Sequence, residues 1–478
     1  MSFVGDKDVI AAARIIRVDG VKDFGGFFFH GVCRPQTAKA NKPSRISEIR
    51  GSAGSLLFLA CIASGVFAAP AHSQTYREDT LSGPDSHEIN PGDQIYLLGD
   101  WDGRRTRLRE RGVRFDFFYA SDTLWGFESE QKGKFASWNR FRGTIDVDLG
   151  SLAGLRGWYF HATALTQGGG NLGEELGLLT GPSGMASAST TRLDSWWIER
   201  RWLDDRIVAR IGQFAGQDFY GVQHYGASFI FEPMGYALGN LFTTFESFDP
   251  FSTPAMEIRV IPFDNMYVKS MVFPQERSPF SNNPTGLVPQ FRGAPVIVSE
   301  IGVTLGQKAS SVNALDNIES RKGYSGLYAF GAVYNPGEFI TAASAAPQSG
   351  NYLLYWKASQ ALWRINPQEA RGLDATVAFD WSPPDINRNN MELTAGLRFN
   401  ETLPLPFHNT MSLGYVRNSI SSEFSPATSP AKTEQGIEFN VLLLYGPILV
   451  QPVVQYYENV GGVAQRATVA GVRTKVEF

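Results

Sequence analysis

The sequence predicts an all-β chain that forms a transmembrane antiparallel β-barrel, with a short amphipathic helix before the first strand. From Val113 onward, apolar and polar residues alternate with a period of two, which is the pattern of strands with two unlike faces. Aromatic residues make up 13% of the chain and glycine contributes 49 residues, as expected for many strands joined by turns. No amphipathic helix follows that could cover a sheet, so lipid around a closed barrel is the expected partner of the apolar faces.

The first part of the chain has the features of an export signal. An apolar run, SLLFLACIASGVFAA (55–69), follows Arg45 and Arg50 and precedes small residues, as in a secretory signal peptide. The run is too short to cross a bilayer comfortably as a helix. We therefore predict an upstream extension or long leader over residues 1–44 and a signal peptide over residues 45–73. A buried helix is the alternative for the apolar run.

Charge and cysteine content narrow the possible classes of protein. The whole chain carries 43 Lys and Arg against 47 Asp and Glu, and the part after residue 73 keeps 34 and 42 of these. Nucleic acid is therefore not an expected partner. Both cysteines, Cys33 and Cys61, lie before that point and cannot cross-link the predicted barrel. No Cys/His spacing typical of zinc is present, so we predict no metal and no cofactor.

Residues 74–112 are predicted to form a polar segment that ends in the short helix. The stretch LLGDWDGRRTRLRERGVRF (97–115) offers Asp100 as a helix N-cap and Gly112 just beyond the last turn. The arginines between them are expected to form a solvated face. One apolar face follows from the spacing of Leu97, Trp101 and Leu108.

Residues 113–478 are predicted to form the barrel. At about 20–25 residues for a strand and its connection, this length accommodates about 14–18 strands, and the number is expected to be even. The last strand, VRTKVEF (472–478), would turn its apolar side chains toward lipid and its three charged ones toward the lumen. A strand in a soluble sheet is the alternative for this terminal pattern. Similar alternation occurs in 113–120, 140–149, 158–165, 206–211 and 257–260.

An ordered set of motifs links the chain to a known family. They are LLGDWDGRRTRLRERGV (97–113), LDSWWIE (193–199), RIGQF (210–214), YSGLYAFGAVYNPGEF (324–339), DWSPPDINRNN (380–390), AGLRFN (395–400), QPVVQYYENVGG (451–462) and ATVAGVRTKVEF (467–478). In these motifs the chain resembles the carbohydrate-selective, OprB-like porins of Gram-negative outer membranes. The resemblance implies a monomeric barrel of sixteen strands, with a trimer as the alternative. It also implies a lumen that inward-folded loops narrow and that passes small, glucose-like mono- and disaccharides.

Some segments depart from the family's pattern. The stretch 219–251 is unusually aromatic, and the loops around 168–190 and 274–295 also differ. In the family, the positions that set selectivity lie near such loops. The resemblance therefore says least about which sugar this chain prefers. The run FIFEPMGYALGNLFTTFESFDPF (229–251) is too aromatic for a wet external loop, and we predict that it folds into the barrel. Its rings would either form a stacking path for solute or only pack against their neighbours.

The passage of a sugar through a pore needs charged side chains that replace water as hydrogen-bond partners of the sugar hydroxyls. It also needs aromatic side chains that contact the apolar face of the sugar ring. Arg140 and Arg142 flank Phe141, and a charge facing lipid near the midplane would cost about 2–4 kcal/mol, so both are predicted to point inward. They would either narrow the pore or line a wide section of it. His161 is expected to be a hydrogen-bonded lumen residue rather than a metal ligand.

The segment 193–203 is predicted to supply the rest of the constriction. Its inward face would carry Trp197, Glu199 and Arg201, because the opposite phase would send Glu199 into lipid. A membrane-interface position is the alternative for Trp197. Arg210 is a further inward arginine that could pair with Glu199, although such a pair is also ordinary strand stabilisation.

Three functional hypotheses follow for an exported outer-membrane protein surrounded by lipid. The first is passive, carbohydrate-selective diffusion, which the mixed Arg/Glu lining favours because an ion-selective pore would show one prevailing sign. The second is a general porin for ions and small solutes. The third is a barrel enzyme, which would need a Ser/His/Asp set at one strand rim. None of the six histidines lies in such a pattern, so we predict that the chain is not an enzyme.

Overall fold

The computed structural model describes the chain from residue 96 to residue 478 with short gaps. The predicted leader, signal peptide and polar segment up to residue 95 lie outside the described residues, as do both cysteines. Within the described part, no helix has both the length and the apolar character needed to cross a membrane. The gaps are residues 129–132, 224, 226–227, 236–237, 242–246, 277–278, 310–322, 343–345, 407 and 425–430.

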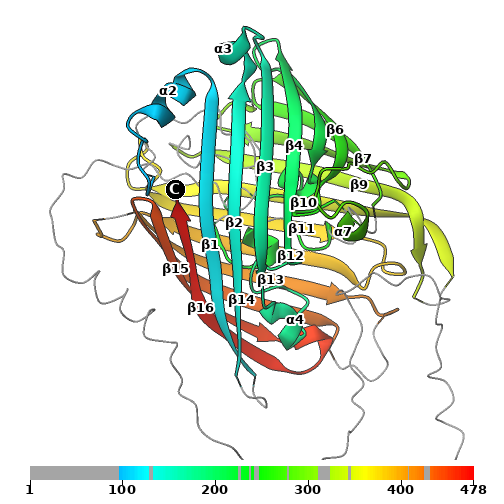
Figure 1. Ribbon diagram of the computed structural model, residues 1–478. Helices are drawn as coiled ribbons and strands as arrows, with labels where there is room; N and C mark the ends of the chain where they lie inside the picture. Colours follow the sequence, from blue (N-terminus) through cyan, green and yellow to red (C-terminus); the bar gives the residue numbers. More distant parts are fainter. Residues whose placement is uncertain are drawn as a thin grey trace, which may run out of the picture. The chain divides into compact units, whose positions relative to one another are not determined.

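Sixteen antiparallel strands close into one barrel, in which each strand pairs with its sequence neighbours and β1 pairs with β16 (Figure 1). The predicted all-β barrel and its strand number are confirmed. The strands are β1 (Val113–Glu128), β2 (Lys134–Asp148), β3 (Trp158–Gly169), β4 (Thr190–Trp202), β5 (Ile207–Phe214), β6 (Thr253–Phe263), β7 (Met266–Pro274), β8 (Pro295–Leu305), β9 (Gly326–Ile340), β10 (Pro347–Arg364), β11 (Gly372–Trp381), β12 (Asn389–Asn400), β13 (His408–Ile420), β14 (Thr433–Tyr445), β15 (Ile448–Glu458) and β16 (Arg466–Glu477).

The two faces of the strands differ as the alternation predicts. Along β8, buried and exposed positions alternate without interruption, with Glu300 inside and Ile297 and Ile301 outside. The outer apolar side chains of the described strands are exposed, and lipid covers such a face in a membrane barrel. All backbone groups of the wall can pair between strands because the sheet has no free edge.

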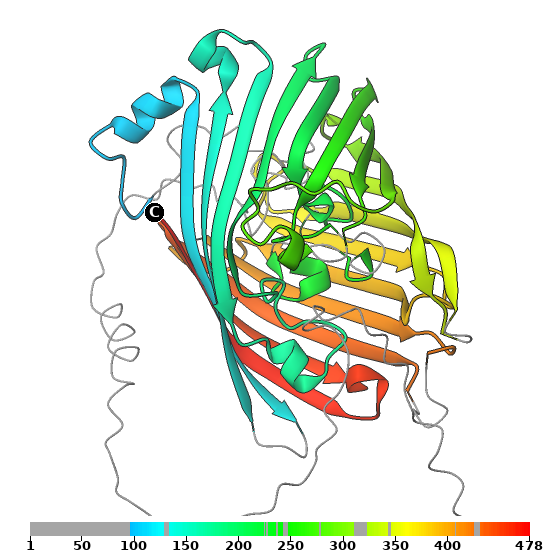
Figure 2. The same cartoon turned by 45° about the vertical axis from the view of Figure 1, so that its right-hand side comes forward.

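The connections at the two ends of the barrel differ in length. At the end that carries α2 (Arg104–Glu110) and α3 (Leu149–Ala153), tight turns such as 203–206 and 446–447 join the strands (Figure 1). At the other end, long loops fold back into the barrel (Figure 2). Short structures in these loops are α4 (Leu172–Leu176), η2 (Gly216–Asp218), α5 (Glu232–Gly235) and α7 (Pro279–Asn282), and η6 (Val460–Gly462) precedes β16.

The N-terminal helix is present but shorter than predicted. It begins at Arg104, after Gly103 with a φ of 76°, and this N-cap glycine has no side chain to cap it. Asp100 lies before the helix, where its Oδ1 accepts a hydrogen bond from the Thr106 N–H at 2.8 Å. Gly112 follows the last turn with a φ of 83°, a conformation that glycine adopts at little cost, as predicted.

The expectation of a fully solvated arginine face on this helix was wrong for Arg105. Its side chain is buried, and Nη2 donates a hydrogen bond to the Phe478 carbonyl oxygen at 2.7 Å. The guanidinium also lies over the Tyr96 and Trp101 rings, 3.5 and 4.3 Å from their centroids. Strand periodicity cannot reveal this contact, because it depends on how the helix returns to the β1–β16 seam.

The terminal strand closes the barrel as predicted. Arg473 and Lys475 point inward, and Arg473 makes two hydrogen bonds to the Asp122 carboxylate, at 2.7 and 2.8 Å. The Phe478 N–H donates to the Phe117 carbonyl oxygen at 2.9 Å, which extends the pairing of β1 and β16 to the last residue.

Candidate functional site

Two long loops, 170–189 and 215–252, fold into the barrel in their described parts (Figure 2), and the loop 275–294 lies beside β4, where its Thr285 carbonyl oxygen accepts the Leu193 N–H at 2.9 Å. The predicted inward folding of 229–251 is confirmed for its described residues. Phe229 and Phe231 are fully buried, and the Phe231 ring packs edge-on against Tyr457 with centroids 5.6 Å apart. These two rings pack against the wall and present no face to a passing solute, so the packing alternative holds for them.

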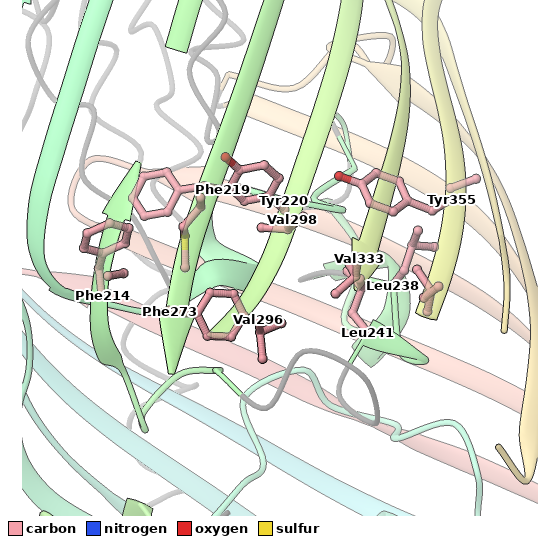
Figure 3. Close-up of a cluster of buried hydrophobic side chains, with 14 of the residues drawn as sticks. Phe214, Phe219, Tyr220, Leu238, Leu241, Phe273, Val296, Val298, Val333 and Tyr355 are labelled. Atoms are coloured by element: carbon pink, nitrogen blue, oxygen red, sulfur yellow. The ribbon is translucent and has the colours of Figure 1, made fainter. Parts of the chain in front are cut away.

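An apolar patch on the inner wall receives the loop 215–252. Figure 3 shows side chains from the loop, including Phe219, Tyr220 and Leu238, beside wall residues such as Val296 and Val298. Inward positions of a water-filled pore are ordinarily polar. Here several inward positions under the loop are apolar, among them Val296 and Val298, and they pack against its side chains.

The predicted Arg/Glu pairing is present on adjacent strands. The register aligns Glu199 of β4 with Arg210 of β5, and Arg210 with Glu257 of β6. Arg210 Nη2 lies 2.6 Å from Glu199 Oε2, and its Nη1 lies 2.9 Å from Glu257 Oε2. Arg201 Nε lies 2.5 Å from Glu199 Oε1. Glu199 is thus shared by two arginines.

Trp197 points into the barrel and is buried, which excludes the interfacial alternative. The Trp197 ring stacks on the His161 ring, with centroids 4.7 Å apart. The Arg210 guanidinium lies 4.5 Å from the Trp197 ring centroid and forms a cation–π contact with it. His161 Nδ1 lies 2.7 Å from Asp146 Oδ1, and Nε2 lies 2.9 Å from Thr163 Oγ1. His161 is a hydrogen-bonded lumen residue, as expected.

Arg140 and Arg142 also point inward, while Phe141 between them is 40% exposed on the outer face. Arg140 Nη1 donates to Asp249 Oδ2 at 2.6 Å and so ties β2 to the loop 215–252. Both arginines are buried, and their direction is as predicted. Arg140 lies behind the inner loops, with Asp249 of one loop and the Met185 carbonyl oxygen of another within hydrogen-bond distance.

Arg201 is the most accessible of the six predicted residues, with 12% of its side chain exposed. Its guanidinium lies 4.5 Å from the Tyr159 ring centroid. On β1, Arg114 Nε lies 2.7 Å from Asp116 Oδ2, and both side chains are partly exposed. The polar surface that a solute can reach therefore extends from β4 toward β1, on the side of the tight turns.

Sequence reasoning missed a second charged cluster, centred on Glu300 of β8. Its carboxylate lies 3.2 Å from Lys269 Nζ and 3.1 Å from Lys357 Nζ. It also accepts hydrogen bonds from the Tyr267 and Tyr355 hydroxyls, at 2.8 and 2.7 Å. Gly302 and Gly331 make this possible, because a side chain there would overlap the tyrosine rings. The alternation of residues along the strands places Lys269, Glu300 and Lys357 inward, so the cluster could have been predicted from the sequence.

The inner loops are joined to each other at Glu232 of α5. Its carboxylate accepts a hydrogen bond from the Gly181 N–H at 3.0 Å, and its own N–H donates to the Gly181 carbonyl oxygen at 3.1 Å. Burial raises the pKa of this carboxyl from 4.5 to about 7. A raised acid pKa means that the folded form loses stability as pH rises between these values.

We therefore expect the contact between the two loops to weaken as pH rises from about 4.5 to about 7. Hydrogen exchange of the amides in 215–252, corrected for the intrinsic pH dependence, should show less protection at the higher pH. Glu232→Gln mimics the protonated carboxyl and should reduce this difference. Equal protection at both pH values in the unmodified protein would contradict the prediction.

The chain matches a known protein family over most of its length. The model of a family described as "Carbohydrate-selective porin, OprB family" matches residues 132–478. Porin B of Pseudomonas aeruginosa is 25% identical over 136 residues, which cover 26% of this chain. The match spans 30% of the length of that relative.

Solved structures share the fold. The high-pH structure of Pseudomonas putida OprB superposes with a TM-score of 0.72 at 17% identity, over 80% of this chain and 99% of that one. Its low-pH structure superposes with a TM-score of 0.51 at 16% identity, over 80% and 98% of the two chains. At such identities, the likeness establishes the barrel fold and no more.

Proposed function

Because this chain belongs to the OprB family of carbohydrate-selective porins, we propose that it passes small sugars by passive diffusion through the barrel. The family and the closed barrel make it a porin of a Gram-negative outer membrane. The substrates proposed are glucose-like mono- and disaccharides. One chain closes a complete barrel, and we propose that it acts as a monomer.

The observation that carries the sugar proposal is the pairing of opposite charges along the inner wall. An uncompensated row of one sign would attract its counter-ions, whereas paired charges offer donors and acceptors to hydroxyl groups without a strong field. Basic residues of the lumen whose nitrogen lies within 3.3 Å of a carboxylate oxygen include Arg114, Arg140, Arg201, Arg210, Lys269, Lys357, Arg364, Arg473 and Lys475.

The proposed path runs along the inner wall from β1 to β6. Arg201 and its neighbour Tyr159 supply a charged group and a ring in the accessible part of the lumen. Arg140, Arg142, Trp197, Glu199 and Arg210 complete the proposed constriction. They are buried here, so in this conformation they shape the path by fixing Arg201 and the inner loops rather than by lining it.

Swelling of proteoliposomes in solutions of matched osmolarity tests the proposal. Neutral glucose should enter faster than gluconate, which is of similar size but charged. A disaccharide should enter more slowly than glucose. Equal rates for glucose and gluconate would favour the alternative, a general porin for ions and small solutes. No entry of any solute through folded protein would overturn the channel itself.

A further inference from the structure

Three glutamates on β12 and β14 accept hydrogen bonds from the main chain of the inner loops. Glu438 of β14 accepts hydrogen bonds from the N–H groups of Ile230 and Phe231, both at 2.8 Å. Each carboxylate oxygen takes one of them. The carboxylate is fully buried, so these contacts are shielded from water. The loop 215–252 is thereby fixed to β14 through its main chain.

Glu434, four residues earlier on the same face of β14, performs the same task for a different loop. It accepts hydrogen bonds from the N–H groups of Leu179 and Thr180, the shorter of them at 2.7 Å. It also accepts from the Gly461 N–H at 2.7 Å. One carboxylate therefore joins the loop 170–189 to the turn between β15 and β16.

Glu392 of β12 completes the set by accepting from the Gly239 N–H at 2.9 Å. In the described part of the chain, none of these three glutamates takes part in an ion pair, and their donors include N–H groups of the inner loops. A carboxyl group offers acceptor positions for several donors. We call Glu392, Glu434 and Glu438 the anchoring glutamates.

The wall beneath the loop is shaped to match. Gly396 and Gly414 are paired across β12 and β13, and the Phe229 ring lies against both. A Cβ at Gly396 would lie 2.7 Å from the Phe229 ring, so a side chain there would push the loop away. The glycines allow the close approach and the glutamates hold it.

We propose that the anchoring glutamates set the size limit of the channel. As positioning residues, they keep the loops 170–189 and 215–252 against β12–β14 and leave the path beside β1–β6. The inference rests on the proposed function only in that the chain is a channel. It concerns the bore and not the preference for sugars.

The test is the size limit of the double variant Glu434→Gln and Glu438→Gln, measured by single-channel conductance with polyethylene glycols of increasing mass. Glutamine has nearly the same volume, but its amide nitrogen cannot accept the loop N–H groups. We expect larger polymers to enter the variant and its conductance to rise roughly two-fold or more. Glu458→Gln is the matched control, because that glutamate of β15 is paired with Arg466 outside the lumen loops.

An unchanged polymer limit in folded double variant would overturn the inference. Folding is verified by heat-modifiable migration in gels. If the double variant does not fold, Glu392→Ala provides the same test, because alanine cannot accept the Gly239 N–H, and an unchanged limit would again overturn the inference. A wild-type channel without sugar preference, together with an enlarged limit in the variant, would overturn the proposed sugar selectivity and support the role of the glutamates.

Discussion

Glu300→Ala is expected to destabilise the barrel by about 3–5 kcal/mol, the range found when one partner of a buried ion pair is removed. Lys269 and Lys357 would lose the carboxylate that lies 3.2 and 3.1 Å from their nitrogens. The two lysines also hold the loop 215–252, because their Nζ atoms donate to the Phe219 and Val222 carbonyl oxygens. Loss of Glu300 should therefore disturb the wall and the loop together.

Unfolding in urea, followed by heat-modifiable migration or tryptophan fluorescence, measures this effect. Glu300→Gln keeps the volume and part of the hydrogen bonding, so it should cost less than the alanine variant. Asp264→Ala is a control, because that exposed carboxylate lies in the tight turn between β6 and β7. A loss below about 1 kcal/mol for Glu300→Ala, as for an exposed pair, would show that the cluster is not a buried ion-pair network.

Glu199→Ala is expected to have the second large effect, a shift of the channel toward anions. Removal of this carboxylate takes from Arg201 its contact at 2.5 Å and takes from Arg210 its ion pair with Glu199, while the pair with Glu257 stays. The smaller alanine side chain would also leave space beside the two guanidinium groups. We expect the ratio of cation to anion permeability to fall roughly three-fold or more.

Reversal potentials across a bilayer with a salt gradient measure this ratio. Glu257→Gln removes one charge but leaves the Glu199 pairs intact, so its shift should be smaller. An unchanged reversal potential in folded Glu199→Ala would contradict the view that paired charges keep the lumen neutral for solutes. The cost in stability should again be several kcal/mol, because buried Arg210 loses one of its carboxylate partners.

The alternation of residues predicted the barrel because lipid imposes a strict condition on every strand. A charge at the wrong phase costs about 2–4 kcal/mol, which determines the direction of Arg140 and Arg142 without any knowledge of their neighbours. The pairing of Arg210 with Glu199 also follows, since consecutive strands of a barrel are adjacent in space. The helix was less predictable, because it begins only after Gly103 and because the burial of Arg105 depends on the distant Phe478.

The parts of the site that escaped prediction depend on contacts between distant segments. Ile230 and Glu438 are separated by 208 residues, and Leu179 and Glu434 by 255. No periodicity reports which wall an inward loop will meet. The spacing of Glu434 and Glu438 on one face of a strand was visible, but two inward carboxylates are equally compatible with an open, wet lumen.

The most direct test of the account is single-channel conductance of the folded protein with glucose added in steps. A sugar-selective path predicts a loss of current that saturates with concentration, as for occupancy of a site in the bore. In Arg201→Ala the half-blocking concentration should rise. A current that falls only as the viscosity of the solution predicts would contradict the central claim, and would leave a general porin in its place.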